Sequence, residues 1–382
     1  MKIWFIILIF LTSFLLSCGF NKATSSHQQT GYIKNLRIQN NQLTFSTPDS
    51  TFVYLSYQDK AQTTDFYQAW SAGHPKTNHI YSLPVKQAGV TYQIDLKVTN
   101  IEKTSYKDTT FVFTATTHQD DFLKVHFINV QQGDAILIET PEGKNIQIDG
   151  GYGTLRNQTW QGSGQPLALN YIHSQNITHF DYLIETHRHE DHWGGLQDIM
   201  NSDISYDIYL SPSDRHGYEV GSTLSLDSAV KFHIYNIGYD STYTENNLNN
   251  SSIVLKAIYD DAEFLFTGDA EGIVQEWLYQ RDFDLSVDVL KVPHHGADSN
   301  NTTDSIFLQK TLNQFAKIAI LSFGENNRYR HPRDLNRFSQ HNVFGTNPVP
   351  NPPTGDNFHF DCGTIIVITD GKLIYVTTDK DR

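Results

Sequence analysis

The sequence predicts an α+β protein in which an all-β domain precedes a larger domain of strands and helices. A chain of 382 residues exceeds the usual length of one domain. Residues 30–118 contain short segments that alternate apolar and polar side chains, with turn residues and no helical stretch between them. From residue 120 onward, apolar strands alternate with helical segments and end in acidic or histidine residues. We therefore expect two domains, residues 30–118 and 120–382.

The N-terminus predicts an export signal rather than part of the fold. Lys2 precedes an apolar stretch over residues 3–16, which is shorter than the roughly 20 residues needed to span a bilayer. Residues 15–18, Leu-Leu-Ser-Cys, resemble a bacterial lipobox, which implies removal of residues 1–17 and lipidation of Cys18. The polar residues 18–29 would then form a tether. We expect a bacterial lipoprotein anchored to a membrane outside the cytoplasm, in the periplasm or at the cell surface, with ordinary signal cleavage as the alternative.

The first domain is predicted to be a β-sandwich. Its strands are expected at residues 33–38, 42–46, 52–56, 91–98 and 110–115. Residues 89–98 resemble the corner before a late strand of fibronectin type III modules, which implies an immunoglobulin/fibronectin-like sandwich. No cluster of metal-binding residues occurs in this part of the sequence. We interpret the domain as a spacer, with a glycan- or partner-binding module as the alternative; the sequence identifies no protein partner.

The second domain is predicted to deliver several loops to one rim of its sheets. Its strands end at glycine turns that carry acidic residues, as at Asp149-Gly150 and Gly268-Asp269. Helices are expected over residues 196–200 and 270–281. The expected strands are residues 123–130, 135–139, 145–149, 180–184, 249–259, 262–269, 287–292, 317–322, 363–369 and 372–376.

Four side chains of metal-binding type occur within six residues at a predicted strand–helix junction. They are His187, His189, Asp191 and His192, and the apolar strand 180–184 precedes them. A lone histidine pair is usually incidental, but this density is typical of a metal site. Imidazole and carboxylate together suit zinc, iron or manganese. His187 and His189 can hold one ion while Asp191 and His192 face a second.

The order of these residues resembles the metallo-β-lactamase superfamily. His-x-His-x-Asp-His is followed by Gly268-Asp269 and then by His294-His295-Gly296. The closer resemblance is to the hydrolase domain of ComEC-type competence proteins, and it covers residues 123–375. The phrases that carry it are Asn-Val-Gln-Gln-Gly-Asp-Ala at 129–135, Ile-Asp-Gly-Gly at 148–151, Leu-Phe-Thr-Gly-Asp-Ala-Glu at 265–271, Lys-Val-Pro-His-His-Gly at 291–296 and Asn-Arg-Tyr-Arg-His-Pro at 327–332.

The resemblance implies an αββα sandwich, two face-to-face sheets with helices outside, and two divalent ions, zinc or manganese, at their edge. The implied metal ligands are His187 and His189 for the first ion, Asp191, His192 and His295 for the second, and Asp269 bridging both. Asp134 and Asp149 are implied to orient the imidazole ligands from behind. His294 would face the substrate. No channel segment follows, so the chain resembles a stand-alone relative of the competence proteins.

One position departs from the wider superfamily. A third histidine for the first ion commonly precedes the hairpin that ends in Gly-Asp, and here residues 249–252 read Asn-Asn-Ser-Ser. We expect Asn249 beside the metal site as a supporting residue. Because an amide oxygen is a weaker ligand than imidazole, the first ion position is expected to be loose, filled by water, or selective for manganese. His216 and His233 are interpreted as surface or packing residues.

The predicted function is metal-dependent hydrolysis of a phosphodiester. Two ions that share a water lower its pKa towards ~7 and hold both oxygens of an in-line displacement. The catalytic candidates are Asp191, Asp269, His294 and His331. Asp191 or Asp269 would manage the proton of the water, and His331 would contact phosphate or protonate the leaving group. The expected substrate-binding residues are Asn327, Arg328, Tyr329 and His331; Arg330 and Arg333 close by have a solvated turn as their alternative interpretation.

The substrate stays open at the level of the sequence. A net charge of −14 disfavours a long duplex, since phosphate binding depends on lysine and arginine. A short single strand of DNA, which would make the protein a nuclease, or a small phosphodiester is expected. The alternatives are hydrolysis of another ester, such as a phosphocholine-bearing polymer, a lactone or a lipid headgroup, and a surface-binding lipoprotein with a vestigial metal site. The metal pattern disfavours a β-lactamase.

Overall fold

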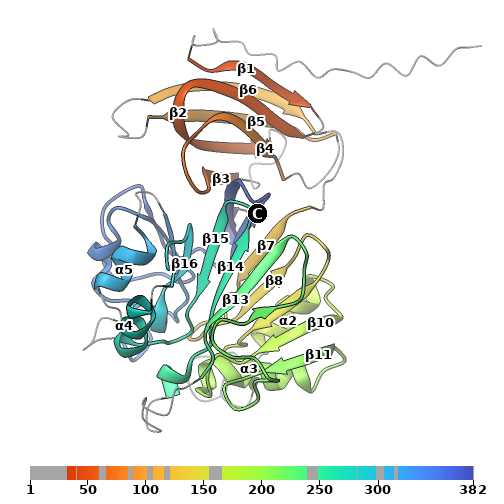
Figure 1. Ribbon diagram of the computed structural model, residues 1–382, viewed down its shortest axis with the longest axis vertical. Helices are drawn as coiled ribbons and strands as arrows, with labels where there is room; N and C mark the ends of the chain where they lie inside the picture. Colours follow the sequence, from red (N-terminus) through yellow and green to blue (C-terminus); the bar gives the residue numbers. More distant parts are fainter. Residues whose placement is uncertain are drawn as a thin grey trace, which may run out of the picture.

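The computed structural model describes residues 32–39, 41–59, 66–84, 89–100, 106–115, 121–154, 166–238, 248–281, 283–297, 305–313 and 317–381 (Figure 1). The predicted signal peptide 1–17, the tether 18–29 and Cys18 lie outside these residues. Within them, no helix is both long and apolar enough to cross a membrane.

The described residues before 116 form strands and no helix. Burial alternates along them, as in β5, where every second side chain from Tyr92 to Val98 is buried. The long strand β2 joins two sets of strands, because its first half pairs with β1 and β4 and its second half with β3 and β5. The strands are β1 (Lys34–Gln39), β2 (Gln42–Asp59), β3 (Phe66–Ser71), β4 (Lys76–Ser82), β5 (Thr91–Thr99) and β6 (Tyr106–Thr114). The predicted strands 42–46 and 52–56 are thus one strand, and the immunoglobulin/fibronectin-like topology stays a prediction.

Two sheets form the larger part of the molecule. One runs in the order β11, β10, β9, β8, β7, β20, β21 and continues into the N-terminal strands through β3. Its strands are β7 (Leu123–Phe127), β8 (Ile136–Glu139), β9 (Asn145–Ile148), β10 (His179–Ile184), β11 (Ser205–Leu210), β20 (Ile365–Thr369) and β21 (Leu373–Thr378). The other runs in numerical order: β12 (Thr223–Leu224), β13 (Val230–Asn236), β14 (Val254–Tyr259), β15 (Ala262–Phe266), β16 (Val289–Lys291), β17 (Ile318–Leu321), β18 (Asn342–Gly345) and β19 (Phe358–His359).

Helices in the described residues are few and short. The α-helices are α2 (Leu167–Ser174), α3 (Glu190–Met200), α4 (Gly272–Gln280) and α5 (Ser305–Thr311). Single 3₁₀ turns are η1 (Leu248–Ser251), η2 (Pro293–Gly296), η3 (Leu335–Phe338) and η4 (Asp379–Asp381). The sheet-rich composition with few helices agrees with the fold class predicted from the sequence.

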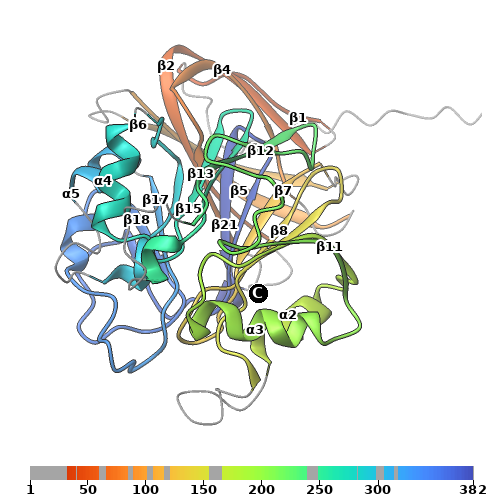
Figure 2. The same cartoon turned by 60° about the horizontal axis from the view of Figure 1, so that its bottom comes forward.

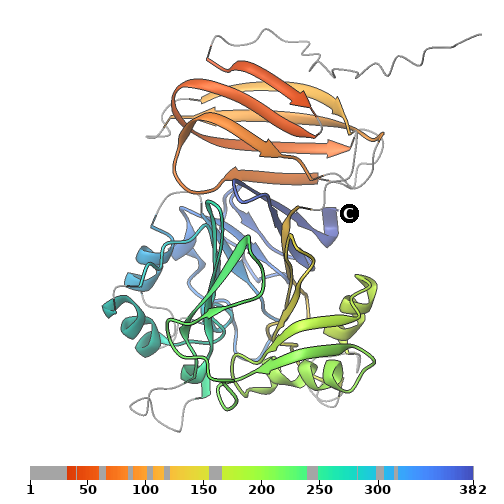
Figure 3. The same cartoon turned by 45° about the vertical axis from the view of Figure 1, so that its right-hand side comes forward.

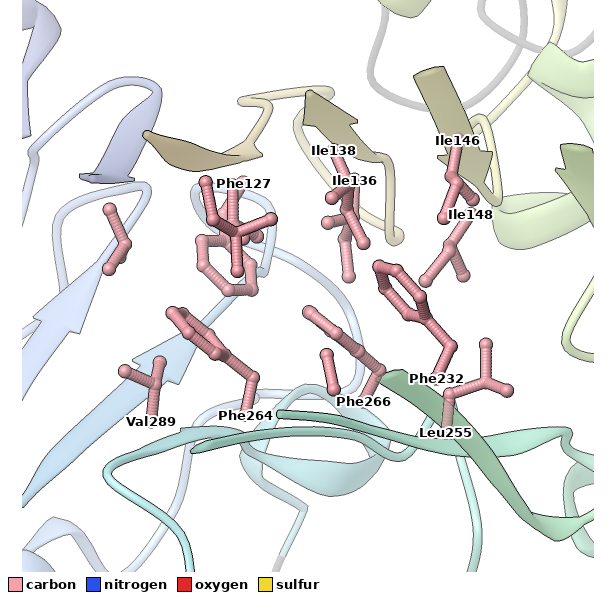
Figure 4. Packing of buried hydrophobic residues seen from close by; sticks show 14 of the residues in the cluster. Phe127, Ile136, Ile138, Ile146, Ile148, Phe232, Leu255, Phe264, Phe266 and Val289 are labelled. Carbon is pink, nitrogen blue, oxygen red and sulfur yellow. The ribbon is translucent and has the colours of Figure 1, made fainter. Parts of the chain in front are cut away.

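The two sheets pack face to face around a shared apolar core (Figure 4). Ile136 of β8 points into this core, whereas Leu137 next to it shares a second core with α2 and α3. Phe264 of β15 likewise points inward, and Leu265 shares a third core with α4 and α5. Successive strand residues face opposite sides of a sheet, so each sheet is covered by helices on its outer face (Figure 2). The result is the helix–sheet–sheet–helix layering that the resemblance implied.

The C-terminal hairpin of β20 and β21 belongs to both parts of the molecule (Figure 3). Val367 faces the core between the two sheets, while Ile366 and Ile368 lie in the core of the N-terminal strands. Strand β21 pairs with β3, and the hydroxyl of Tyr375 donates a hydrogen bond to the carbonyl of Ser82 at 2.6 Å. The boundary predicted near residue 119 therefore separates two chain segments whose sheet is continuous.

Candidate metal centre

The predicted metal ligands gather where parallel strands of both sheets end. Strands β9 and β10 run parallel, and the chain leaves them at Asp149 and at the segment 185–189. Strands β15 and β16 also run parallel and lead towards Asp269 and η2. Loops that follow parallel strands share one edge of a sheet, which is where α/β proteins commonly bind ligands. Because the two sheets face each other, these loops meet above the central core.

Glycines allow helix α3 to lie directly against the loop that follows β9. A Cβ atom on Gly195 would lie 1.9 Å from the carbonyl oxygen of Gly150, so only a residue without Cβ permits this approach. The amide of Gly150 in turn donates a hydrogen bond to the carbonyl of His192 at 2.7 Å. The first turn of α3, which carries Asp191 and His192, is thereby fixed beside that loop.

The first ligand group consists of His187, His189 and Asp269, whose ligand atoms all lie within 4.8 Å of one another. Nε2 of His187 is 3.0 Å from Nδ1 of His189 and 3.8 Å from Oδ2 of Asp269. His187 is completely buried, and this burial, together with the positive charge of His192, lowers its pKa well below the ordinary value. The imidazole of His187 is therefore neutral, as a metal ligand must be.

The second ligand group consists of Asp191, His192 and His295. Nε2 of His295 is 3.4 Å from Oδ2 of Asp191. Asp269 reaches this group as well, because its Oδ1 is 3.2 Å from Nε2 of His192 and its Oδ2 is 3.6 Å from Nε2 of His295. Asp269 therefore lies between the two groups, where a carboxylate can bridge two ions.

Two buried carboxylates lie behind the imidazoles, and both are residues that the resemblance implied as supports. Asp149 lies 2.7 Å from Nδ1 of His192 and accepts hydrogen bonds from the amide and the hydroxyl of Thr186 at 2.8 and 2.6 Å. Asp134 pairs with Lys291 at 2.7 Å and lies 3.4 Å from Nδ1 of His295. Such partners fix the ring orientation and tautomer of a ligating histidine.

Within the cluster, the carboxylates raise the pKa of two histidines, and these histidines lower the pKa of a carboxylate. Burial alone would lower the pKa of His295, but the negative charges of Asp269 and Asp134 outweigh it and raise the pKa to about 10. The pKa of His192 is also raised, by Asp269 and Asp149 against burial. Burial would raise the pKa of Asp269, and the cationic His192 and His295 instead lower it well below its ordinary value. Carboxylates and imidazoles here are thus strongly coupled.

Three buried atoms of the cluster have no hydrogen-bond partner among the described residues: Nε2 of His192, Nε2 of His295 and Oδ1 of Asp269. His192 and Asp269 approach to 3.2 Å without hydrogen-bond geometry. Unpaired buried polar atoms are uncommon in folded proteins. Because imidazole nitrogens and carboxylate oxygens are the donors that zinc and manganese prefer, the side chains present fit two divalent ions.

A cavity of about 260 Å³ opens above the ligand groups. It is lined by Gln132, Tyr152, His189, Glu190, Asp191, Asp269, His294, His295, Arg328, Tyr329 and His331. His294 lies between two carboxylates, with Nε2 3.7 Å from Asp269 and Nδ1 3.6 Å from Glu271. Its backbone is left-handed, with φ at 48°, a conformation that a non-glycine residue keeps only where the surroundings hold it.

The loop after β17 contributes Arg328, Tyr329 and His331 to the lining of this cavity; that they bind substrate stays a prediction. The guanidinium of Arg328 lies 4.6 Å from the centre of the Tyr329 ring. Burial lowers the pKa of His331 to about 3, and positive charge on the neighbouring His295 and His294 acts in the same direction, against the smaller opposing effect of Asp269. Asn327 does not line the cavity: its side chain is buried and bonds the carbonyls of Gly324 and His331, both at 2.8 Å, so it shapes the loop.

Segment 249–252, where a third histidine ligand was expected, instead places a hydroxyl behind His187. Ser252, fully buried, places Oγ 3.3 Å from Nδ1 of His187 and accepts a hydrogen bond from the amide of Asp269 at 3.0 Å. Asn249, expected beside the metals, instead donates its side-chain amide to Glu271 at 2.8 Å. Sequence reasoning did not single out the roles of Ser252, Thr186, Lys291, Glu271 or Tyr152. Thr186 and Lys291 had one local signal in the sequence: both are polar residues that stand at the end of an apolar strand, next to a histidine motif.

Comparison with known proteins shows what the chain is similar to. The metallo-beta-lactamase superfamily matches residues 128–209, so the chain contains a domain of that superfamily. ComE operon protein 3 of Bacillus subtilis (strain 168) is a homologue, 26% identical over 250 residues. The aligned region is 58% of this chain, and the chain spans about a third of that relative's length (31%). The crystal structure of a new diphosphatase from the PhnP family covers 65% of this chain and 99% of its own, at 11% identity and a TM-score of 0.35.

Proposed function

We propose that the protein is a metal-dependent hydrolase of phosphodiesters. One observation carries the proposal: two groups of metal-binding side chains share Asp269 at the base of a cavity of about 260 Å³ that Arg328 also lines. A cationic group beside a two-ion site suits a substrate whose reacting centre is anionic. The metallo-β-lactamase superfamily domain and the homology to ComE operon protein 3 support a hydrolase.

The side chains that would hold the ions are His187, His189 and Asp269 for one, and Asp191, His192 and His295, together with Asp269, for the other. Two bound ions, zinc or manganese, supply a hydroxide at neutral pH and stabilise charge on the oxygens of an in-line displacement. Asp191 and Asp269 lie within the cavity lining, so either carboxylate can accept the proton that the attacking water loses.

The loop after β17 binds the substrate. A hydrogen bond of 2.6 Å from Arg328 to the hydroxyl of Tyr329 holds the guanidinium at the cavity, where it can contact a phosphate oxygen. His331 is neutral at physiological pH because its pKa is lowered, so it suits a phosphate contact through its N–H better than a proton donor. His294, which also lines the cavity, is the residue we propose for protonating the leaving oxygen.

The size and charge of the site favour a short substrate. The chain carries a net charge of −14, and Arg328 is the one arginine among the described residues that line the cavity. Since affinity for nucleic acid increases with the number of phosphates that lysine and arginine neutralise, a long duplex would bind weakly. We therefore propose a small phosphodiester or a short single strand of DNA as the substrate.

The place of action is proposed from the N-terminus. The lipobox-like residues 15–18 support a lipoprotein anchored through Cys18 on the outer side of a bacterial membrane. Metabolic labelling with a radioactive fatty acid tests this, because Cys18→Ser is expected to abolish labelling. Label that persists in the Cys18→Ser variant would contradict the proposal.

The hydrolase proposal is tested by incubating the purified chain with manganese or zinc and two substrates, bis-p-nitrophenyl phosphate and a single-stranded oligodeoxynucleotide. We expect cleavage of both, and a loss of at least about 100-fold for Asp191→Ala, the order of magnitude that positioned acid–base groups contribute. Asp203→Ala is the matched control, because Asp203 is 89% exposed and outside the cavity lining. This variant is expected to keep full activity.

The two substrates separate the possible outcomes. Cleavage of bis-p-nitrophenyl phosphate alone would exclude the nuclease and retain a small or polymer-borne phosphodiester. Cleavage of neither, by protein that binds two ions per chain, would refute the phosphodiesterase. The hydrolysis of another ester, such as a lactone, or a surface-binding role would then have to be tested in its place.

A further inference from the structure

The two ion positions differ in the ligands that the chain offers. The second position has three side chains of its own, Asp191, His192 and His295. The first has only His187 and His189, and it depends on the shared Asp269 for a third donor. Fewer protein ligands leave more coordination positions for water or substrate oxygens.

The two ion positions also differ in the groups that support their ligands. In the second position, Nδ1 of His192 meets the carboxylate of Asp149 at 2.7 Å, and Nδ1 of His295 meets the carbonyl of Ser322 at 2.9 Å. In the first, Nδ1 of His187 has only two hydroxyls nearby, at 3.2 and 3.3 Å. Carboxylates and carbonyls behind an imidazole raise its basicity, so the second position is better supported.

Ser252 supports the ligands of the first position from behind. Its Oγ accepts the amide hydrogen of Asp269 and lies beside Nδ1 of His187, on the side of the ring away from the ligand atom Nε2. The hydroxyl therefore orients two ligands instead of acting as one. Neighbouring Asn249 and Asn250 both bond Glu271, the first through its Nδ2 at 2.8 Å and the second through its Oδ1, which accepts the backbone amide of Glu271 at 3.2 Å.

We propose that the chain binds its two ions unequally: one tightly between Asp191, His192 and His295, and one weakly at His187 and His189, where Ser252 is a positioning residue. The open coordination positions of the weak ion are then available to an oxygen of the substrate. This last step rests on the proposed phosphodiester hydrolysis, whereas the inequality itself does not.

Titration of the ion-free full chain with manganese, followed by calorimetry and by electron paramagnetic resonance of free and bound Mn²⁺, tests the inequality without any substrate. We expect two binding events whose dissociation constants differ by at least about tenfold. His295→Ala is expected to abolish the tight event and His187→Ala the weak one. Two equal events, or loss of the tight event in His187→Ala, would overturn the proposal.

Ser252 is tested by its own pair of variants. Ser252→Ala removes the hydroxyl and is expected to weaken the weak event by about 10–100-fold, as loss of supporting groups usually does, and to leave the tight event unchanged. Ser252→Thr keeps the hydroxyl and is expected to restore the weak event. Equal weakening of both events in a Ser252→Ala protein of normal melting temperature would show that Ser252 does not act on one position.

Dimethyl phosphate, a diester that hydrolyses very slowly, tests the substrate step separately. Its addition is expected to tighten the weak manganese event several-fold and to leave the tight one unchanged. If the two unequal events occur without dimethyl phosphate but do not respond to it, the inequality stands and the substrate step is refuted. If bis-p-nitrophenyl phosphate is also not cleaved, the proposed function fails as well.

Discussion

Replacement of Lys291 by methionine removes the cationic partner of an ion pair whose two side chains are both buried. Lys291 and Asp134 are each about 1% exposed, and Nζ lies 2.7 Å from the Asp134 carboxylate. Nζ also donates a hydrogen bond to the carbonyl of Val292 at 3.1 Å. Methionine has nearly the same length and volume, so the substitution removes the charge and the two contacts without leaving a large cavity.

The expected cost follows from the carboxylate that is left behind. Loss of one partner of a buried pair typically destabilises a protein by about 3–5 kcal/mol, because the remaining charge is uncompensated. In a domain of some 250 residues, about 2–4 °C of melting temperature correspond to 1 kcal/mol, so we expect a fall of roughly 6–20 °C. The neighbouring His295, 3.4 Å from Asp134, can supply part of the missing positive charge. The lower half of this range is therefore expected.

Differential scanning calorimetry of the ion-free protein measures the effect. Lys124→Met is the matched control, because Lys124 is 36% exposed and lies 3.7 Å from Glu139; exposed pairs contribute about 0–1 kcal/mol. A double variant that also replaces Asp134 by leucine is expected to recover part of the loss, since it removes the unpaired charge. A melting temperature of Lys291→Met within 1–2 °C of the wild type, or equal to that of the control, would refute the reasoning.

Three further perturbations have defined outcomes. With its pKa raised to about 10, His295 carries a proton at neutral pH in the ion-free protein. Metal binding is expected to release this proton, so the affinity for the metal rises with pH. Calorimetry in two buffers of different ionisation enthalpy measures the proton release. Binding heats independent of the buffer would contradict this. Asp149→Asn places an amide N–H₂ against the donors of Thr186 and His192 and is expected to weaken metal binding about 10–100-fold, as measured by metal analysis after dialysis. The exposed Asp203→Asn is expected to leave the metal content unchanged. A fragment of residues 119–382 is expected to aggregate, because one face of the hairpin of β20 and β21 loses the core that covers it. Each large apolar side chain exposed in this way costs about 1.5–3 kcal/mol of stability. A monodisperse fragment in size-exclusion chromatography would contradict this expectation.

The ligand groups could be predicted because their signal is local. His187, His189, Asp191 and His192 fall on one strand–helix junction, and the apolar strand before them fixes where the chain turns. Strand ends rich in acid and glycine, such as Asp149, are equally visible in sequence, and parallel strands then bring them to one edge. These features depend on short segments whose hydrophobic pattern leaves little choice.

The supporting residues could not be predicted, because their neighbours are distant in the chain. Ser252 lies 65 positions from His187 and 17 from Asp269, and nothing in Asn-Ser-Ser-Ile distinguishes a hydroxyl that bonds both. For Asn327, local reasoning assigned a substrate contact to a residue whose side chain instead shapes its loop. It belongs to a motif with Arg328 and His331, yet its amide is fully engaged with the backbone of its own loop. Motif membership alone does not separate a residue that touches the cavity from one that shapes it.

The sheet arrangement bears on the role of the N-terminal strands. A module that only adds distance from a membrane needs no fixed orientation, yet β3 pairs with β21 and Lys76 forms an ion pair with Asp261. Gly73 donates its amide to the carboxylate of Asp288, which also pairs with Lys317 inside the second sheet at 2.6 Å. Contacts along the whole junction thus hold the module in one orientation relative to the metal centre.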